Sequence, residues 1–275
     1  MVEELLNRAG ININHATENG YSALIGAAEK GYSEIVKLLL KMRDIKINHI
    51  NESGYSALMR AADKGHSEIV KLMLDNTDID TNLTDYFGNS ALTLAVSRGC
   101  NETVKLLLNR MDIDINYLKR GDSALMLAVR SGRKDMVKSL LNRTEIDINC
   151  VNRNGSTALI VATEHKHIEI VKLLLDCATV DINKANLKGE TALMVAIIGG
   201  HTEFIELFVK RKDIDSNVKD LIGKTAFFMA INKSDYNTAK LLIIAKILNL
   251  AIKTKRIMSP VNLMNKISWF RLPYY

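Results

Sequence analysis

Residues 54–74 read GYSALMRAADKGHSEIVKLML, and this stretch decides the fold because six other stretches of the chain follow its pattern. The seven copies begin at Gly20, Gly54, Gly88, Gly121, Gly155, Gly189 and Gly223. The steps between these glycines are 34, 34, 33, 34, 34 and 34 residues. A fixed period of this length indicates a repeat protein, in which each copy packs on its neighbours and no single central core forms.

Each copy predicts two short helices and a hairpin. Residues 56–64 begin with a hydroxyl side chain suited to N-capping and continue with small and apolar residues, which indicates a closely packed helix. Residues 67–74 carry Ile69, Val70 and Met73 at helical spacing, which indicates a second, amphipathic helix. The following DIDTN alternates acidic and β-branched residues and predicts an extended arm that enters a turn. The predicted fold class is an all-α solenoid of stacked helix-turn-helix units with projecting hairpin loops.

This pattern resembles the ankyrin repeat, whose motif has a turn glycine, a TPLH tetrapeptide, an alanine pair, a Gly-His between its helices and a leucine-rich second helix. The matching residues of the quoted copy are Gly54, Ser56, Leu58, Ala61, Ala62, Gly65, His66, Val70, Leu72, Leu74 and Asn82. The resemblance implies a non-enzymatic scaffold or adaptor that binds a partner protein. We therefore expect a partial N-terminal repeat or cap in residues 1–14, an array of seven copies in residues 15–245, and a basic C-terminal cap or tail in residues 246–275.

The copies depart from the ankyrin motif at the TPLH tetrapeptide. Alanine replaces its proline in every copy. Its histidine is replaced by Ile25, Met59, Thr93, Met126, Ile160, Met194 and Phe228. We therefore expect apolar packing at this position instead of the family's hydrogen-bond network.

Three local irregularities carry further predictions. Most copies have one residue more than the usual 33, and the extra residue follows the second helix. Pairs such as Arg110-Met111 and Arg143-Thr144 stand there, where the family has a capping glycine. We therefore expect an altered C-cap at the end of the second helix. Lys166 stands where the inter-helix glycine belongs. The hairpin containing Arg120-Gly121-Asp122 is one residue shorter than the others, so we interpret this tripeptide as an irregular turn and not as an adhesion motif.

Composition and charge limit the functional classes. The chain has 275 residues, 47% hydrophobic and 25% charged, as in ordinary globular proteins. Its acidic start and its lack of a long apolar run predict a cytoplasmic protein, with the nucleus as an alternative. The net charge of +6 comes from the tail, whose basic residues are Lys246, Lys253, Lys255, Arg256, Lys266 and Arg271. An alternative function is therefore a targeting module whose basic, aromatic tail contacts an anionic membrane or nucleic acid.

Residues suited to catalysis or metal binding do not cluster in the sequence. His165 and His167, flanked by Glu164 and Glu169, form the only local group of candidate metal ligands, and no second pair of ligands stands at usable spacing nearby. Phosphate-loop, nucleophile-elbow and zinc-protease motifs do not occur. We therefore expect no enzyme activity, no metal, no cofactor and no small-molecule substrate.

The resemblance to ankyrin repeats implies that a partner protein binds at the hairpin tips and the concave helix face. Aromatic and arginine side chains, which are enriched at interface hot spots, gather at these positions in the second to fourth copies. The candidate partner-binding residues are Tyr55, Tyr86, Phe87, Arg98, Lys119, Arg120 and Arg130. The partner itself is not identified by the sequence, because repeat proteins keep the fold and vary the surface.

Overall fold

The computed structural model describes residues 11–253, with side chains described to residue 245. Residues 1–10 of the expected N-terminal cap and residues 254–275 of the expected tail lie outside the described part. The chain divides into two compact units, Met1–Arg153 and Asn154–Tyr275, and the division falls after the fourth complete copy. The sequence period continues across this division without a change and did not predict it.

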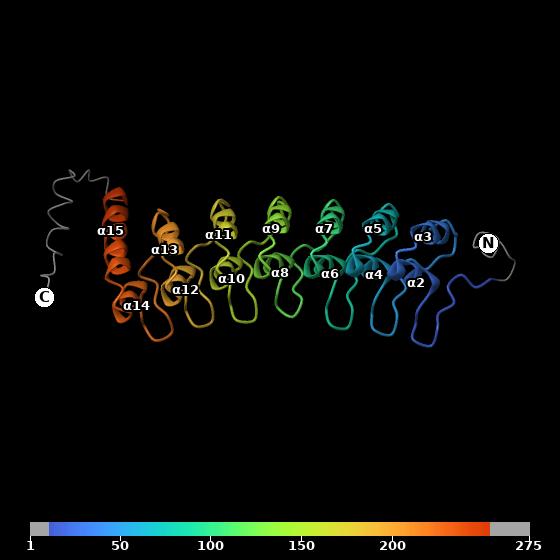
Figure 1. Cartoon of the computed structure of the whole chain (residues 1–275), viewed down its shortest axis with the longest axis horizontal. Helices are drawn as coiled ribbons and strands as arrows, with labels where there is room; N and C mark the ends of the chain where they lie inside the picture. The colour runs from blue at the N-terminus through green and yellow to red at the C-terminus, as the bar shows by residue number, and fades with distance from the viewer. Residues whose placement is uncertain (1–10, 254–275) are drawn as a thin grey trace, which may run out of the picture. The chain divides into compact units, whose positions relative to one another are not determined.

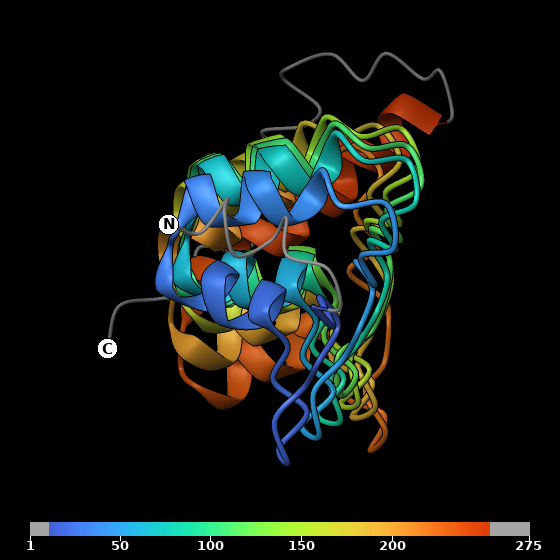
Figure 2. The same cartoon turned by 90° about the vertical axis from the view of Figure 1, so that its right-hand side faces the viewer.

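Each copy contributes one inner and one outer helix (Figure 1). The inner helices are α2 (Ala23–Lys30), α4 (Ala57–Lys64), α6 (Ala91–Arg98), α8 (Ala124–Arg130), α10 (Ala158–Glu164), α12 (Ala192–Gly199) and α14 (Ala226–Asn232). The outer helices are α3 (Ser33–Leu40), α5 (Ser67–Leu74), α7 (Asn101–Leu108), α9 (Lys134–Leu141), α11 (Ile168–Leu175), α13 (Thr202–Val209) and α15 (Tyr236–Lys253). Within each unit the helices form two layers, and the hairpins gather on one side of them (Figure 2). The expected all-α solenoid is confirmed.

The hydroxyl residue after each turn glycine caps the inner helix, as the sequence predicts. Ser56 has an extended backbone, and its side chain accepts a hydrogen bond from the Met59 N–H at 3.3 Å. Thr157 does the same for the Ile160 N–H. Because this bond satisfies one of the unpaired donors of the first turn, each inner helix starts at a defined residue.

The residues that replace the family's TPLH histidine are buried in every copy but the last. Met59, Met126 and Met194 are at most 1% exposed. Thr93 is also buried, and its hydroxyl oxygen accepts a hydrogen bond from the Ser90 N–H at 2.8 Å. Apolar packing therefore replaces the histidine network in the copies with Ile or Met at this position. The expectation is wrong for the third copy, where Thr93 keeps a hydrogen bond at the helix start. Phe228 of the last copy is 47% exposed.

The turn between the two helices requires a left-handed residue. Gly65 and Gly200 have φ of 73° and 67° there. Lys166 and Ser234 take the same conformation with φ of 61° and 57°, although they carry side chains. Left-handed backbone costs an L-residue roughly 1–2 kcal/mol, so these two turns are strained where the others are not.

The outer helices from α3 to α13 end in a right-handed C-cap residue and not a left-handed one, which confirms the altered cap. Asp75, the cap residue of α5, has φ −71° and ψ −13°. The Arg110 Nη1 atom of the next copy donates a hydrogen bond to the carbonyl of Leu74 at 2.9 Å, and Arg143 Nη1 donates to the carbonyl of Leu108. Where an arginine occupies this position, it therefore supplies a cap from the following copy.

Asparagines connect the arms of successive copies. The Asn82 side-chain amide donates to the Asp112 carbonyl at 2.7 Å, and its oxygen accepts from the Asp114 N–H at 2.7 Å. Asn116 makes the equivalent pair with Glu145 and Asp147. Since each amide uses both its donor and its acceptor, the arms form a continuous ladder within unit 1.

The last outer helix is longer than the others. α15 has 18 residues, whereas α13 has eight. It runs past residue 245, so the expected boundary between array and tail falls inside a helix. Among residues 11–253, no helix combines the length and the apolar character that a membrane crossing needs.

Candidate functional site

The hairpin tips are shaped by side chains that hold the turn from inside. Asp85 is 3% exposed, and its Oδ1 atom accepts hydrogen bonds from the N–H groups of Phe87 and Asn89 at 2.9 and 2.7 Å. This arrangement fixes the backbone and projects the two residues before the turn glycine outward. Tyr86 is 72% exposed and Phe87 is 55% exposed. Two large aromatic side chains therefore stand on a rigid turn.

Backbone hydrogen bonds join successive tips into a second ladder. In unit 1 the Glu52 N–H donates to the Asn19 carbonyl at 3.2 Å, and the Tyr86 N–H donates to the Ser53 carbonyl at 3.4 Å. In unit 2 the Leu221 N–H donates to the Lys188 carbonyl at 3.0 Å. These tips are therefore each supported by the tip before them.

The shortened hairpin interrupts this ladder. Lys119 and Asp122 exchange two backbone hydrogen bonds, at 2.9 and 3.0 Å, across only two central residues. Arg120 and Gly121 have φ of 50° and 94°, the positive values that a type I′ turn needs. Within the described part of unit 1, no backbone hydrogen bond joins this tip to the Tyr86-Phe87 tip. The Arg120 guanidinium instead lies 5.5 Å from the centre of the Phe87 ring.

Arg130 holds the base of the shortened hairpin. Its Nη1 and Nη2 atoms donate to the two carboxylate oxygens of Asp122 at 2.5 and 3.0 Å. This bidentate pair fixes Asp122 against the end of α8. The carboxylate of the Arg-Gly-Asp tripeptide is thus engaged within the repeat, in agreement with its interpretation as a structural turn.

Tyr55 belongs to a network beneath the tips. The Arg60 guanidinium lies 3.8 Å from the centre of its ring and also donates to the Tyr21 hydroxyl at 2.8 Å. Burial raises the pKa of the Tyr55 phenol, and a hydrogen bond to the Asp85 carboxylate raises it further. Tyr55 is only half-exposed and therefore supports the hairpin that carries Tyr86 and Phe87.

Arg98 is the last residue of α6, one of the inner helices. Its Nε atom donates to the Asp63 carboxylate at 2.6 Å, and 61% of its side chain is exposed while Asp63 is almost buried. Asp63 lies on α4, the neighbouring inner helix, so this bond orients the Arg98 guanidinium against that helix. Much of the Arg98 side chain remains exposed to solvent. Arg98 is therefore a positioned cation at the end of an inner helix.

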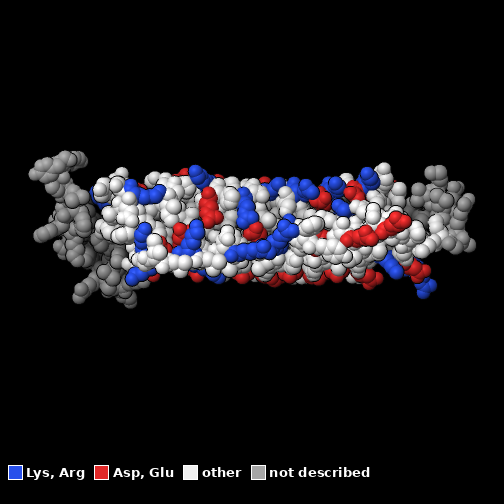
Figure 3. Space-filling view, turned by 90° about the horizontal axis from the view of Figure 1, so that it is seen from below, with Lys and Arg blue, Asp and Glu red and all other residues white. Residues whose placement is uncertain are grey.

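The structure brings some of the predicted residues together directly and others through shared neighbours. Arg120 contacts Phe87. Tyr55 and Arg98 share Asp63 as a neighbour. Lys119 is half-buried in the short hairpin, while Arg130 and Arg98 are exposed. Figure 3, which views the molecule from below Figure 1, shows basic side chains interspersed with acidic ones, so charge on this face is local rather than one broad basic surface.

Three exposed aliphatic residues at the tips of unit 2 were not predicted from the sequence. Leu187, Leu221 and Ile222 are 68%, 77% and 73% exposed. Leu187 and Leu221 stand two residues before their turn glycines, as Tyr86 does, and Ile222 stands at the position of Phe87. Applying the same offset to the last two copies would have found them.

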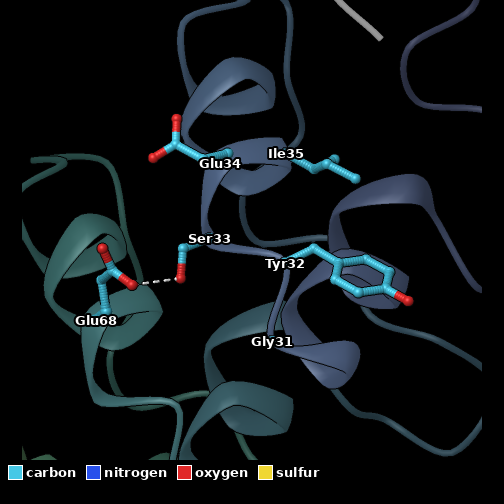
Figure 4. A pocket seen from close by; sticks show the side chains of 6 residues that line it. All are labelled: Gly31, Tyr32, Ser33, Glu34, Ile35 and Glu68. Carbon is cyan, nitrogen blue, oxygen red and sulfur yellow. Dashed lines mark hydrogen bonds between the residues drawn. The ribbon is translucent and has the colours of Figure 1, made fainter. Parts of the chain in front are cut away.

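A histidine pair and one surface pocket are two further features of the described residues. The His165 and His167 rings stack with centroids 6.1 Å apart, and the described residues hold no group of three or more possible metal ligands. A pocket of about 380 Å³ lies beside α3, where the Ser33 hydroxyl donates to Glu68 Oε2 at 2.7 Å (Figure 4). The pocket is open to solvent, and Tyr32 at its edge is 56% exposed.

The fold and the tips define the class of the molecule as a repeat solenoid with projecting hairpins. A family model described as ankyrin repeats (3 copies) matches residues 1–85, 43–119, 92–186 and 178–254. The chain belongs to the ankyrin repeat family. Ankyrin repeats generally act as protein–protein interaction modules, and they are typically not enzymes.

Solved structures show the same fold. The ankyrin repeat domain of Bcl-3, described as a unique member of the IkappaB protein family, superposes with a TM-score of 0.74 at 23% identity, over 82% of this chain and 99% of that one. EF0377, an ankyrin repeat protein, superposes with a TM-score of 0.61 at 32% identity, over 68% of this chain and 96% of that one.

A curated relative matches only a short stretch. Cortactin-binding protein 2 from Echinops telfairi is 48% identical over 40 residues, which are 14% of this chain and 2% of that protein. A match of this extent concerns little more than one repeat of this chain.

Proposed function

We propose that the chain is a non-enzymatic scaffold or adaptor, working in the cytoplasm, that holds a partner protein at the hairpin tips and concave edge of its second to fourth copies. The docking surface consists of Tyr86, Phe87, Lys119 and Arg120 at the tips, Arg98 and Arg130 on the helix side, and Tyr55 as support. The observation that carries this proposal is the 72% exposure of Tyr86 and 55% exposure of Phe87 on a turn fixed by Asp85.

The geometry favours a partner with an apolar anchor next to acidic groups. The two aromatic rings offer apolar area at little entropic cost, since the turn already fixes their backbone. The Arg120 guanidinium beside Phe87 adds a cation with part of its donor set directed to solvent. Because a polyanion needs many phosphate contacts along a continuous basic surface, the mixed charges of this face favour a protein over nucleic acid.

The test compares two matched double variants in a quantitative capture experiment. Tyr86→Ala with Phe87→Ala removes the aromatic pair, and Leu221→Ala with Ile222→Ala removes the equally exposed pair at the same tip position of unit 2. A partner retained by the wild type and the second variant but lost by the first supports the proposal. Equal retention by all three chains contradicts it, provided that circular dichroism shows unchanged helix content.

A further inference from the structure

The tips of the last two hairpins of unit 2 expose aliphatic side chains. Leu187, Leu221 and Ile222 are 68%, 77% and 73% exposed. The two tips adjoin, because the Leu221 N–H donates to the Lys188 carbonyl at 3.0 Å, and both hairpins project to the same side of the helices (Figure 1). The three aliphatic side chains therefore stand on one projecting edge of unit 2, which we call the aliphatic edge.

The backbone of both tips is fixed by side chains of the same hairpins. Asp220 Oδ1 accepts hydrogen bonds from the N–H groups of Ile222 and Lys224 at 3.0 and 2.7 Å. Asn186 Oδ1 holds its own turn in the same way and accepts from two backbone N–H groups, both at 2.9 Å. Because the turns are already ordered, little backbone entropy is lost when the aliphatic edge meets another surface.

The charge that the aliphatic edge presents to solvent is positive. Lys188 and Lys219 flank the aliphatic side chains and are exposed. The acidic residues of these two tips, Glu190 and Asp220, are half-buried. Glu190 Oε2 accepts a hydrogen bond from a side-chain amide at 3.0 Å, and the Asp220 carboxylate holds its turn. The acidic groups are therefore engaged within the hairpins, while the two lysines face outward.

We propose that the aliphatic edge docks this chain on the surface of an anionic lipid membrane. The leucine and isoleucine side chains enter the interface, and Lys188 and Lys219 lie at the headgroups. The strength of interfacial binding comes from buried apolar area together with electrostatic attraction to anionic lipids, and the aliphatic edge supplies both.

The composition of the aliphatic edge favours lipid over protein. Protein interfaces are enriched in aromatic residues and arginine and depleted in lysine, and leucine is under-represented among their hot spots. Tyr86 and Phe87 of the third copy fit that description, whereas the tips of unit 2 carry aliphatic side chains and lysines at the same positions. A lysine can lay its methylene stem along apolar surface and keep its ammonium group in the polar layer.

Cosedimentation of the full chain with vesicles tests the apolar part of the contact. The vesicles contain phosphatidylcholine and phosphatidylserine in a three-to-one ratio. Leu221→Ser should weaken binding at least about fivefold, since it removes a side chain that enters the interface. The matched control is Met111→Ser, because Met111 is also 77% exposed but lies in unit 1. Equal binding by the two variants overturns the proposal.

A second pair of variants tests the charge. Lys188→Glu with Lys219→Glu should weaken binding about tenfold at low salt. The control, Lys210→Glu with Lys212→Glu, makes the same change of net charge at two exposed positions after α13. It should change binding by less than about twofold. Equal losses in both variants would mean that only the overall charge attracts the chain, and they overturn the proposal, as does equal binding to vesicles of phosphatidylcholine alone.

Hydrogen exchange locates the contact on the wild-type chain. Amides of residues 186–189 and 219–224 should exchange at least several-fold more slowly when the anionic vesicles are present. Protection confined to other parts of the chain overturns the proposal. Absence of binding to these vesicles also overturns it and leaves the aliphatic edge to a protein partner. The docking surface of unit 1 shares no residue with the aliphatic edge, so failure of either proposal leaves the other standing.

Discussion

Arg110 donates a hydrogen bond through Nη1 to the carbonyl oxygen of Leu74, the last residue of α5, at 2.9 Å. Arg211 makes the same contact with the last residue of α11 at 2.8 Å. A guanidinium from the following copy thus replaces the glycine that ends this helix elsewhere in the family. The inserted residue therefore couples neighbouring copies, and its loss should weaken the interface between them.

Replacing Arg143 with alanine should lower the free energy of unfolding by about 2 kcal/mol, the usual cost of losing a charge-assisted hydrogen bond. Its guanidinium donates to the carbonyls of Leu108 and Arg110, and only 13% of its side chain is exposed. Urea unfolding gives the value. Arg43→Ala, at an exposed position of the first copy, is the control and should change stability by less than about 0.5 kcal/mol. Equal effects of the two substitutions would refute the capping role.

Replacing Lys166 with glycine should stabilise the chain by about 1 kcal/mol, since the turn holds φ at 61° and glycine adopts this conformation without strain. The reverse change, Gly200→Lys, should destabilise the chain by a similar amount. An added Cβ at Gly200 meets nothing within 4 Å, so only backbone strain is introduced. Thermal unfolding of both variants measures the difference. A lower melting temperature for Lys166→Gly would contradict the account.

Low pH should remove the contribution of the Arg211–Asp213 pair to the free energy of unfolding. Their two hydrogen bonds, at 3.0 and 2.9 Å, lower the pKa of Asp213. A lowered pKa in the folded state stabilises the chain above the unfolded value of about 3.9, and this contribution is lost as pH falls through the folded value. Asp213→Asn should therefore lower the free energy of unfolding at pH 7 and have little effect on it near pH 2.

Urea midpoints at several pH values test this dependence. Arg211→Met is the matched control, because it removes the partner and should give the same loss of pH dependence. A destabilisation by Asp213→Asn that is equally large at both ends of the pH range would show that charge is not its cause.

The sequence predicted the helices closely because the repeat shows the same pattern seven times. The second copy forms helices at Ala57–Lys64 and Ser67–Leu74, next to or at the expected bounds. The shortened hairpin at Arg120 was also predicted, since a missing residue is visible against a fixed period. Local pattern and spacing are enough for features that one copy contains by itself.

Features that depend on two copies were harder to predict. The sequence indicated an altered cap at Arg143 but not the carbonyl of Leu108 that it binds, which lies in another copy. Phe228 occupies the position of Met194, yet its exposure differs because, among the described residues, α14 packs on α12 and no later inner helix packs on α14. The sequence predicted Tyr55 as an exposed aromatic residue at a tip, whereas Arg60 and Asp85 hold its side chain beneath the tips. Such differences arise from packing between copies, and periodicity within one copy does not encode them.

Site-specific photo-crosslinking tests the docking surface most directly. A benzophenone amino acid replaces Phe87 in one chain and Ile222 in another, since both positions precede the turn glycine and are largely exposed. Under irradiation in the native cellular environment, position 87 should crosslink to one discrete protein, and Arg120→Ala should reduce the yield. Crosslinks to that protein from position 222 but not from position 87 would contradict the assignment of the surface to the second to fourth copies.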